Sequence, residues 1–174
     1  MAADPIDFWF TMGSTYSYLS VMRLGELERP VSLPVPYPAK QSIKANLVAI
    51  VGMRQGWGVD FVRAAYRRWF QLGQETGSEP NVSESLRDIG QEPQSVLALA
   101  NATDATTALM AETDVAKKLG IFGSPTFVVG RELFWGDDRL DDAISWHRHR
   151  SVKLLADNSY TTPRDIPEPD SLGG

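Results

Sequence analysis

The chain contains no cysteine, and this absence limits both its fold and its chemistry. Disulfide bonds and thiolate metal sites are excluded, so a hydrophobic core has to hold the fold together. A chain of 174 residues can bury roughly 70% of the surface that its unfolded form exposes, which is enough for such a core. A catalytic cysteine and dithiol redox chemistry are excluded as well. Any sulfur chemistry would therefore have to arrive on a ligand.

Composition and charge restrict the partners that we expect. Hydrophobic residues make up 43% of the chain and charged residues 22%, which is typical of a globular protein. The net charge is −5 and no basic block is longer than a pair such as Arg67–Arg68, which argues against a nucleic-acid or membrane partner. Asp4 and Asp7 precede only a short apolar run, which is not typical of a secretory signal. We therefore expect a cytoplasmic protein.

Sequence periodicity predicts a strand, a helix and then a block of helices. Residues 6–11 alternate apolar and other side chains, which indicates a strand, and a turn at 12–14 leads into a helix that runs to Glu28. From Ser42 to Ala116 apolar residues recur at helical spacing. Glycines mark helix ends inside and after this block, at Gly73, Gly90 and Gly120.

The period changes to two after this block. Thr126–Val129 and Glu132–Trp135 flank Gly130–Arg131, a pattern typical of a tight β-hairpin. Asp137–Asp138 then opens a last helix. A β-α start and a β-β-α end, separated by helices, predict an α/β domain with an all-helical insertion. The proline-containing tail at 157–174 is expected to be extended or disordered.

Two segments have the properties of a ligand site. Ser14–Ser17 lies at the junction of strand and helix, and a helix N-terminus favours an anion through its unpaired backbone N–H groups. Ser124–Pro125 enters the hairpin, where a cis peptide could expose backbone donors and acceptors.

The motif at the first junction resembles the serine-type branch of the thioredoxin-fold disulfide oxidoreductase superfamily. Phe8–Phe10 is followed by Ser14–Leu19, in which Ser14 and Ser17 have the spacing of the Cys-x-x-Cys of redox members. Residues 119–127 and 134–140 resemble the other two motifs of that branch. The chain is most similar to the 2-hydroxychromene-2-carboxylate isomerase family, with kappa-class glutathione transferases as near relatives.

The resemblance covers most of the chain except residues 29–40, and it implies a thioredoxin-like fold with an inserted all-helical domain. The thioredoxin-like domain would consist of residues 1–33 and 117–156. The helical insertion would span residues 34–116.

The resemblance also implies an activity. The family reaction is a glutathione-dependent isomerisation that interconverts 2-hydroxychromene-2-carboxylate and trans-o-hydroxybenzylidenepyruvate. Glutathione would be the cofactor, a small aromatic molecule the substrate, and the protein a homodimer. Two alternatives remain open: a kappa-like glutathione transferase or peroxidase, and a glutathione-binding module without turnover.

Site residues follow from the same resemblance. Ser14 would be the catalytic residue, because its hydroxyl could donate a hydrogen bond to the thiolate of glutathione. Ser124 would pair with the glutathione peptide through its backbone, ahead of a cis-Pro125. The segment around the γ-glutamyl end would consist of Trp135, Gly136, Asp137 and Asp138. Within it, Asp138 could accept a hydrogen bond from the ammonium group.

Each of these residues also has a structural interpretation. Ser14 could be only a helix N-cap, and Ser17 is expected to be structural. Asp137 could cap a helix as readily as bind a ligand, whereas the resemblance favours ligand binding for Asp138. The chain also departs from the family, which usually has an acid at Thr11 and an aliphatic residue at Ser124 (and proline in place of Thr15).

No metal site is predicted. His147 and His149 are two residues apart on a predicted helix, so they do not face each other, and no third ligand is evident.

Residues 29–40 contain four prolines and make a poor central strand. The family has a proper strand after its first helix, so we expect that a segment is absent here. A Cα–Cα step much longer than ~3.8 Å between Glu26 and Pro34 would reveal it.

Overall fold

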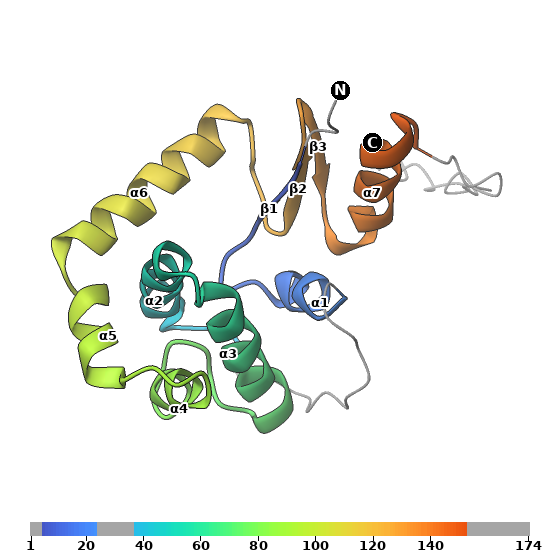
Figure 1. Cartoon of the computed structure of the whole chain (residues 1–174). Coiled ribbons are helices and arrows are strands. Elements are labelled where there is room, and N and C mark those ends of the chain that lie inside the picture. Colours follow the sequence, from blue (N-terminus) through green and yellow to red (C-terminus); the bar gives the residue numbers. More distant parts are fainter. Residues whose placement is uncertain (1–4, 24–36, 153–174) are drawn as a thin grey trace, which may run out of the picture.

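The computed structural model describes residues 5–23 and 37–152. A small sheet packs beside helix α7 (Leu140–His149), and helix α1 (Thr15–Arg23) follows its first strand. Helices α2 (Ser42–Gln55) to α6 (Thr103–Lys118) form an arc that leaves this unit and returns to it (Figure 1). The predicted break between Glu26 and Pro34 and the predicted extended tail at 157–174 lie outside the described residues.

The sheet has three strands in the order β1 (Ile6–Trp9), β2 (Thr126–Val129) and β3 (Glu132–Trp135). Both pairs are antiparallel, with Phe8 opposite Phe127 and Phe127 opposite Phe134. The connection between β2 and β3 contains Gly130 with a positive φ of 65°, which glycine adopts readily. The predicted hairpin is therefore confirmed.

A short 3₁₀ turn, η1 (Asp137–Arg139), opens helix α7 (Leu140–His149), which packs on β2 and β3. Leu140 and Ala143 of α7 share a small buried cluster with Phe127, Val129 and Phe134. This cluster fixes the hairpin, and with it the residues at both hairpin ends, against the last helix.

The remaining helices are α1 (Thr15–Arg23), α2 (Ser42–Gln55), α3 (Gly58–Leu72), α4 (Asn81–Asp88), α5 (Pro93–Ala100) and α6 (Thr103–Lys118). Gly73 and Gly120 adopt positive φ directly after α3 and close to the end of α6, as the sequence predicted. Among the residues described here, no helix is long and apolar enough to cross a membrane.

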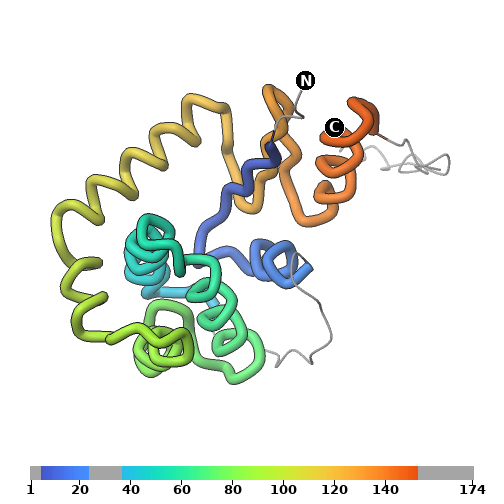
Figure 2. Tube along the Cα trace, in the orientation of Figure 1, coloured from blue at the N-terminus to red at the C-terminus, as the bar shows by residue number. Residues whose placement is uncertain are grey.

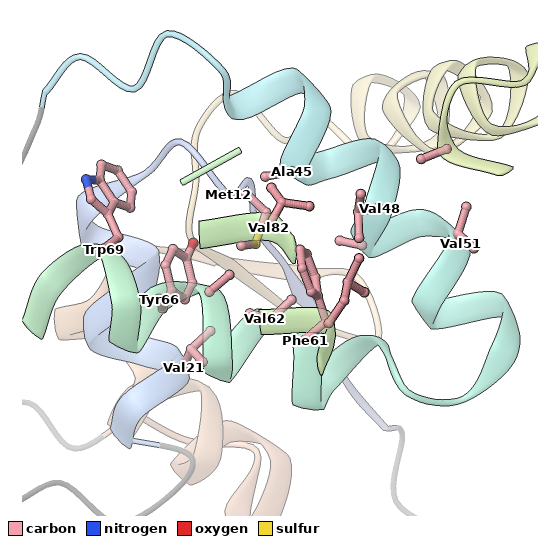
Figure 3. Packing of buried hydrophobic residues seen from close by; sticks show 14 of the residues in the cluster. Met12, Val21, Ala45, Val48, Val51, Phe61, Val62, Tyr66, Trp69 and Val82 are labelled. Atoms are coloured by element: carbon pink, nitrogen blue, oxygen red, sulfur yellow. The ribbon is translucent and has the colours of Figure 1, made fainter. Parts of the chain in front are cut away.

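The largest core lies among α1, α2, α3 and α4 and is rich in aromatic side chains (Figure 3). Phe61, Tyr66 and Trp69 of α3 are fully buried at its centre. Met12, from the turn before α1, and Tyr18, from α1 itself, belong to the same cluster, and the Tyr18 ring stacks on Phe70 at 3.9 Å. The beginning of α1 is thus held by the core of the helical part of the molecule, which determines where the candidate site lies.

Candidate functional site

Ser14 stands at the junction between the β1 segment and α1, and its hydroxyl makes two contacts. Its Oγ accepts a hydrogen bond from the backbone N–H of Ser17 at 3.2 Å, which is the geometry of an N-cap. The same hydroxyl donates to the carbonyl oxygen of Ser124 at 3.0 Å. Ser14 therefore caps the helix and also joins it to the second predicted ligand segment.

The electrostatics around Ser14 suit an anion. The first turn of α1 contains no acidic residue, and the unpaired N–H groups of a helix start carry about half a positive charge. Ser14 and Thr15 are partly exposed, so a ligand could reach this end of the helix.

Ser124 is held by its side chain as well as by its carbonyl. The Ser124–Pro125 peptide is cis, as predicted. The Ser124 hydroxyl accepts a hydrogen bond from the backbone N–H of Thr11 at 2.9 Å and lies 2.8 Å from the hydroxyl of Ser17. Ser17 is fully buried, in agreement with its predicted structural role. The sequence indicated only a backbone role for Ser124, and these side-chain contacts were not predicted.

Asn46 and Tyr66 fix the turn before Ser14. The Asn46 side chain of α2 accepts a hydrogen bond from the backbone N–H of Met12 at 2.9 Å and donates one to the Thr11 hydroxyl at 3.0 Å. The Tyr66 hydroxyl of α3 donates to the Thr11 carbonyl at 3.0 Å. Burial raises the pKa of Tyr66, against a smaller lowering by its hydrogen bond with Ser17, so this phenol remains a donor. No signal in the sequence identified either residue.

The predicted segment Trp135–Asp138 lies against the segment Ser124–Pro125. The backbone N–H of Gly136 donates to the Pro125 carbonyl at 3.0 Å, and Gly136 has a φ of 111°. The indole of Trp135 lies over Gly123, where an added Cβ would come within 2.2 Å of its Nε1 atom. Any larger residue than glycine at position 123 would displace this ring.

Asp137 and Asp138 have different surroundings. Asp137 accepts a hydrogen bond from the Ser20 hydroxyl at 2.9 Å and forms an ion pair with Arg23 at 3.4 Å, so it anchors η1 to α1. Asp138 is exposed, and its side chain makes no hydrogen bond or ion pair with residues 5–23 or 37–152. The structure thus supplies a positioning role for Asp137 and leaves the carboxylate of Asp138 available to a ligand.

The predicted residues from all three segments therefore come together around the first turns of α1. Ser14 meets Ser124, Pro125 meets Gly136, and Asp137 meets α1. The approach of the turn before α7 to α1 can be followed along the trace in Figure 2. A pocket of about 510 Å³ adjoins this group, with Thr11, Gly123 and Ser124 in its wall. Within the described part of the chain, no group of three or more acidic or histidine side chains could hold a metal ion.

Residues 26–144 match the model of the DsbA-like thioredoxin domain family. Because this match covers more than half of the chain, the protein belongs to that family. The fold agrees, since its β1–α1 unit, antiparallel hairpin and last helix are those of a thioredoxin-like domain interrupted by helices.

A more specific likeness comes from a curated relative, the 2-hydroxychromene-2-carboxylate isomerase of Sphingobium xenophagum. It is 25% identical over 122 residues, which cover 68% of this chain and 63% of the isomerase. The chain thus spans less than two thirds of the length of that relative.

Solved structures show the same fold. The structure of a 2-hydroxychromene-2-carboxylate isomerase superposes with a TM-score of 0.69 at 18% identity, covering 80% of this chain and 92% of the other. A thioredoxin-like oxidoreductase from Silicibacter pomeroyi DSS-3 gives a TM-score of 0.58 at 22% identity, with 82% and 85% of the two chains covered. Proteus mirabilis ScsC gives 0.52 at 15% identity, with 83% of each chain covered.

The contact between the hydroxyls of Ser17 and Ser124 can be measured by a double-mutant cycle. We expect Ser17→Ala and Ser124→Ala each to lower the free energy of unfolding by about 1 kcal/mol. The free energy of unfolding lost by the double variant should be about 1 kcal/mol smaller than the sum of the two single losses, because the contact is already absent after the first substitution. Urea denaturation of the four proteins gives these values.

Ser83→Ala, on α4, is the matched control, and its effect should add to that of Ser17→Ala. Additive losses for Ser17→Ala and Ser124→Ala themselves would contradict the contact.

Proposed function

We propose that the protein is a glutathione-dependent isomerase that acts on aromatic compounds of the 2-hydroxychromene-2-carboxylate type. One observation carries this proposal: the Ser14 hydroxyl lies at the positive end of α1 and contacts the carbonyl of the residue before cis-Pro125. An anionic sulfur and an extended peptide could bind side by side at such a place. The likeness to an isomerase of this type supports the reaction class.

Binding of glutathione would exchange hydrogen bonds at Ser14. In the free protein the Ser14 hydroxyl donates to the Ser124 carbonyl. A backbone N–H of the bound peptide could take over that carbonyl, in the way that an added strand pairs with a sheet edge. The Ser14 hydroxyl would then be free to donate to the sulfur, while its oxygen continues to cap Ser17.

This arrangement would favour the thiolate form of glutathione. A free thiol has a pKa of about 8.5, and both a helix N-terminus and a hydrogen-bond donor lower it. A serine hydroxyl does not ionise in this range, so the nucleophile belongs to the ligand, which is consistent with a chain without cysteine.

The reaction would combine opening of the chromene ring with reversible addition of the thiolate. Ring opening breaks the bond between C2 and the ring oxygen, and the proton of the C2 hydroxyl passes to that oxygen, which gives a phenol and a ketone conjugated to a cis double bond. The thiolate would add to the aryl-bearing carbon of this double bond, and the displaced electron pair would move onto the ketone oxygen as an enolate. After rotation about the new single bond, the enolate would re-form the double bond in the trans geometry and expel the thiolate. Each glutathione molecule is thereby regenerated. The contribution of the protein is to hold both molecules in a productive orientation and to lower the pKa of the thiol.

Asp138 would recognise the opposite end of glutathione. Its carboxylate is exposed beside Trp135 and Gly136, and it makes no polar contact with the described residues. An ammonium group could therefore pair with it without breaking an existing interaction.

The role of Asp138 can be tested by isothermal titration of two ligands. Asp138→Asn should weaken glutathione binding by about tenfold, because a hydrogen bond to a charged group contributes about 1.5–3 kcal/mol. Binding of a glutathione analogue without the amino group should be unchanged. Asp114→Asn, on α6, is the control and should affect neither ligand.

An equal loss for both ligands would show that Asp138 does not meet the ammonium group.

The activity itself is tested by following 2-hydroxychromene-2-carboxylate under steady-state conditions with glutathione. The isomer should form with no net loss of glutathione, and omission of glutathione should abolish the reaction. Ser14→Ala should lower kcat/KM by about tenfold or more, because it removes a charge-assisted hydrogen bond to the nucleophile. Ser95→Ala, exposed on α5, should leave the rate unchanged.

Accumulation of a conjugate or of glutathione disulfide would identify a transferase or peroxidase instead. Glutathione binding without any thiol-dependent reaction would identify a binding module.

A further inference from the structure

The pocket beside Ser124 is lined both by residues of the β1 segment and by helices of the helical block. Strand β1 and the residues after it form one wall, α2 and α6 form two others, and Ile121, Gly123 and Ser124 complete the lining. Figure 1 shows where β1, α2 and α6 lie in the fold. We call it the β1–α6 pocket. Its volume of about 510 Å³ lies within the range of small-molecule sites, about 300–1,000 Å³. Neither Ser14 nor the segment 135–138 lines it.

The wall of the pocket is largely apolar. Phe8 and Phe10 form its aromatic side, and their rings are stacked with centroids 5.0 Å apart. The facing helices contribute aliphatic side chains, among them Ile50, Met53 and Leu109. Ala108 and Ala116 of α6 also line the pocket, and their short side chains leave space for a ligand. Flat aromatic molecules fit between such surfaces, since aromatic rings pack favourably on one another.

Most polar side chains in the wall are already engaged. Thr11 and Asn46 bond to each other, and the Ser124 hydroxyl bonds to the Thr11 N–H. Thr113 donates to the Leu109 carbonyl at 2.8 Å, and Arg54 pairs with Asp104 at 2.7 Å. A ligand that accepts hydrogen bonds would therefore compete with an existing contact at these side chains.

Glu112 is the remaining charged group of the wall. Its carboxylate makes no hydrogen bond or ion pair with the part of the chain that the structure describes. A ligand that carries a carboxylate would meet this negative charge, and its possible cation, Arg54, is occupied by Asp104. Of the two charged groups in the wall, the one without a partner among the described residues, Glu112, is therefore negative and disfavours an anion.

From these contacts we propose that the β1–α6 pocket binds an uncharged aromatic molecule. This site goes beyond the function proposed above, because it requires no glutathione and does not suit the carboxylate substrate of the isomerase reaction. Its occupant would lie against Ser124, the residue whose carbonyl Ser14 contacts.

The test compares two probes with the same rings, 1-naphthol and 1-naphthoate, by isothermal titration at neutral pH without glutathione. The naphthol is uncharged under these conditions and should bind several-fold more tightly than the naphthoate, which is an anion. Glu112→Gln should remove most of this difference by improving naphthoate binding.

Two further variants locate the site. Ala116→Phe should fill the pocket and weaken naphthol binding by about tenfold or more. Ala111→Phe places the same side chain on α6 at an exposed position outside the pocket and should leave binding unchanged. Circular dichroism establishes that both variants are folded.

Equal or tighter binding of naphthoate to the unaltered protein would overturn the proposal, as would unchanged naphthol binding in a folded Ala116→Phe variant. Absence of binding by both probes would also overturn it. Glutathione binding, titrated separately, is unaffected by any of these outcomes, so this proposal and the proposed function can fail independently.

Discussion

The hydrogen bond from the Ser14 hydroxyl to the Ser124 carbonyl joins two segments that are 110 residues apart in the sequence. It fixes the start of α1 against the loop that enters the hairpin. The contact of the Ser124 hydroxyl with Ser17 adds a second link between the same segments. Because Ser14 uses its oxygen for the helix cap and its proton for Ser124, the cap and the proposed ligand recognition depend on one side chain.

The rest of the molecule holds these two serines in place. Met12, before Ser14, and Tyr18, after it, are both buried in the helical core. Asn46 and Tyr66 hold the backbone at Met12 and Thr11, between β1 and Ser14, by hydrogen bonds. On the other side, the hairpin is held by the small cluster under α7. The helical block is therefore part of the support of the site as well as a wall of the neighbouring pocket.

Features that depend on neighbours in the sequence could be predicted well. The hairpin at Gly130, the helix ends at Gly73 and Gly120 and the cap at Ser14 all follow from local preferences, and the structure confirms them. The assignment of Ser14 and Ser124 to one ligand was predicted from three motifs in a family order, since neither serine alone distinguishes a cap from a site. Their direct hydrogen bond was not predicted.

Features that depend on distant contacts could not be predicted. Asn46 and Tyr66 act on Thr11 from helices that lie 35 and 55 residues further along the chain, and in the sequence they look like ordinary helix residues. The same holds for Arg54, which lines the pocket, and Asp104, with which it forms an ion pair. Periodicity assigns a residue to a helix but does not say what its side chain meets.

Ultraviolet absorbance of the thiolate measures the pKa of the glutathione thiol in the complex, which depends on the proposed contact between Ser14 and the sulfur. We expect a value well below the ~8.5 of a free thiol, and a rise by about one to two in Ser14→Ala, since the lost hydrogen bond contributes about 1.5–3 kcal/mol. A bound thiol with the ordinary pKa, or a lowered pKa that Ser14→Ala leaves unchanged, would contradict that contact.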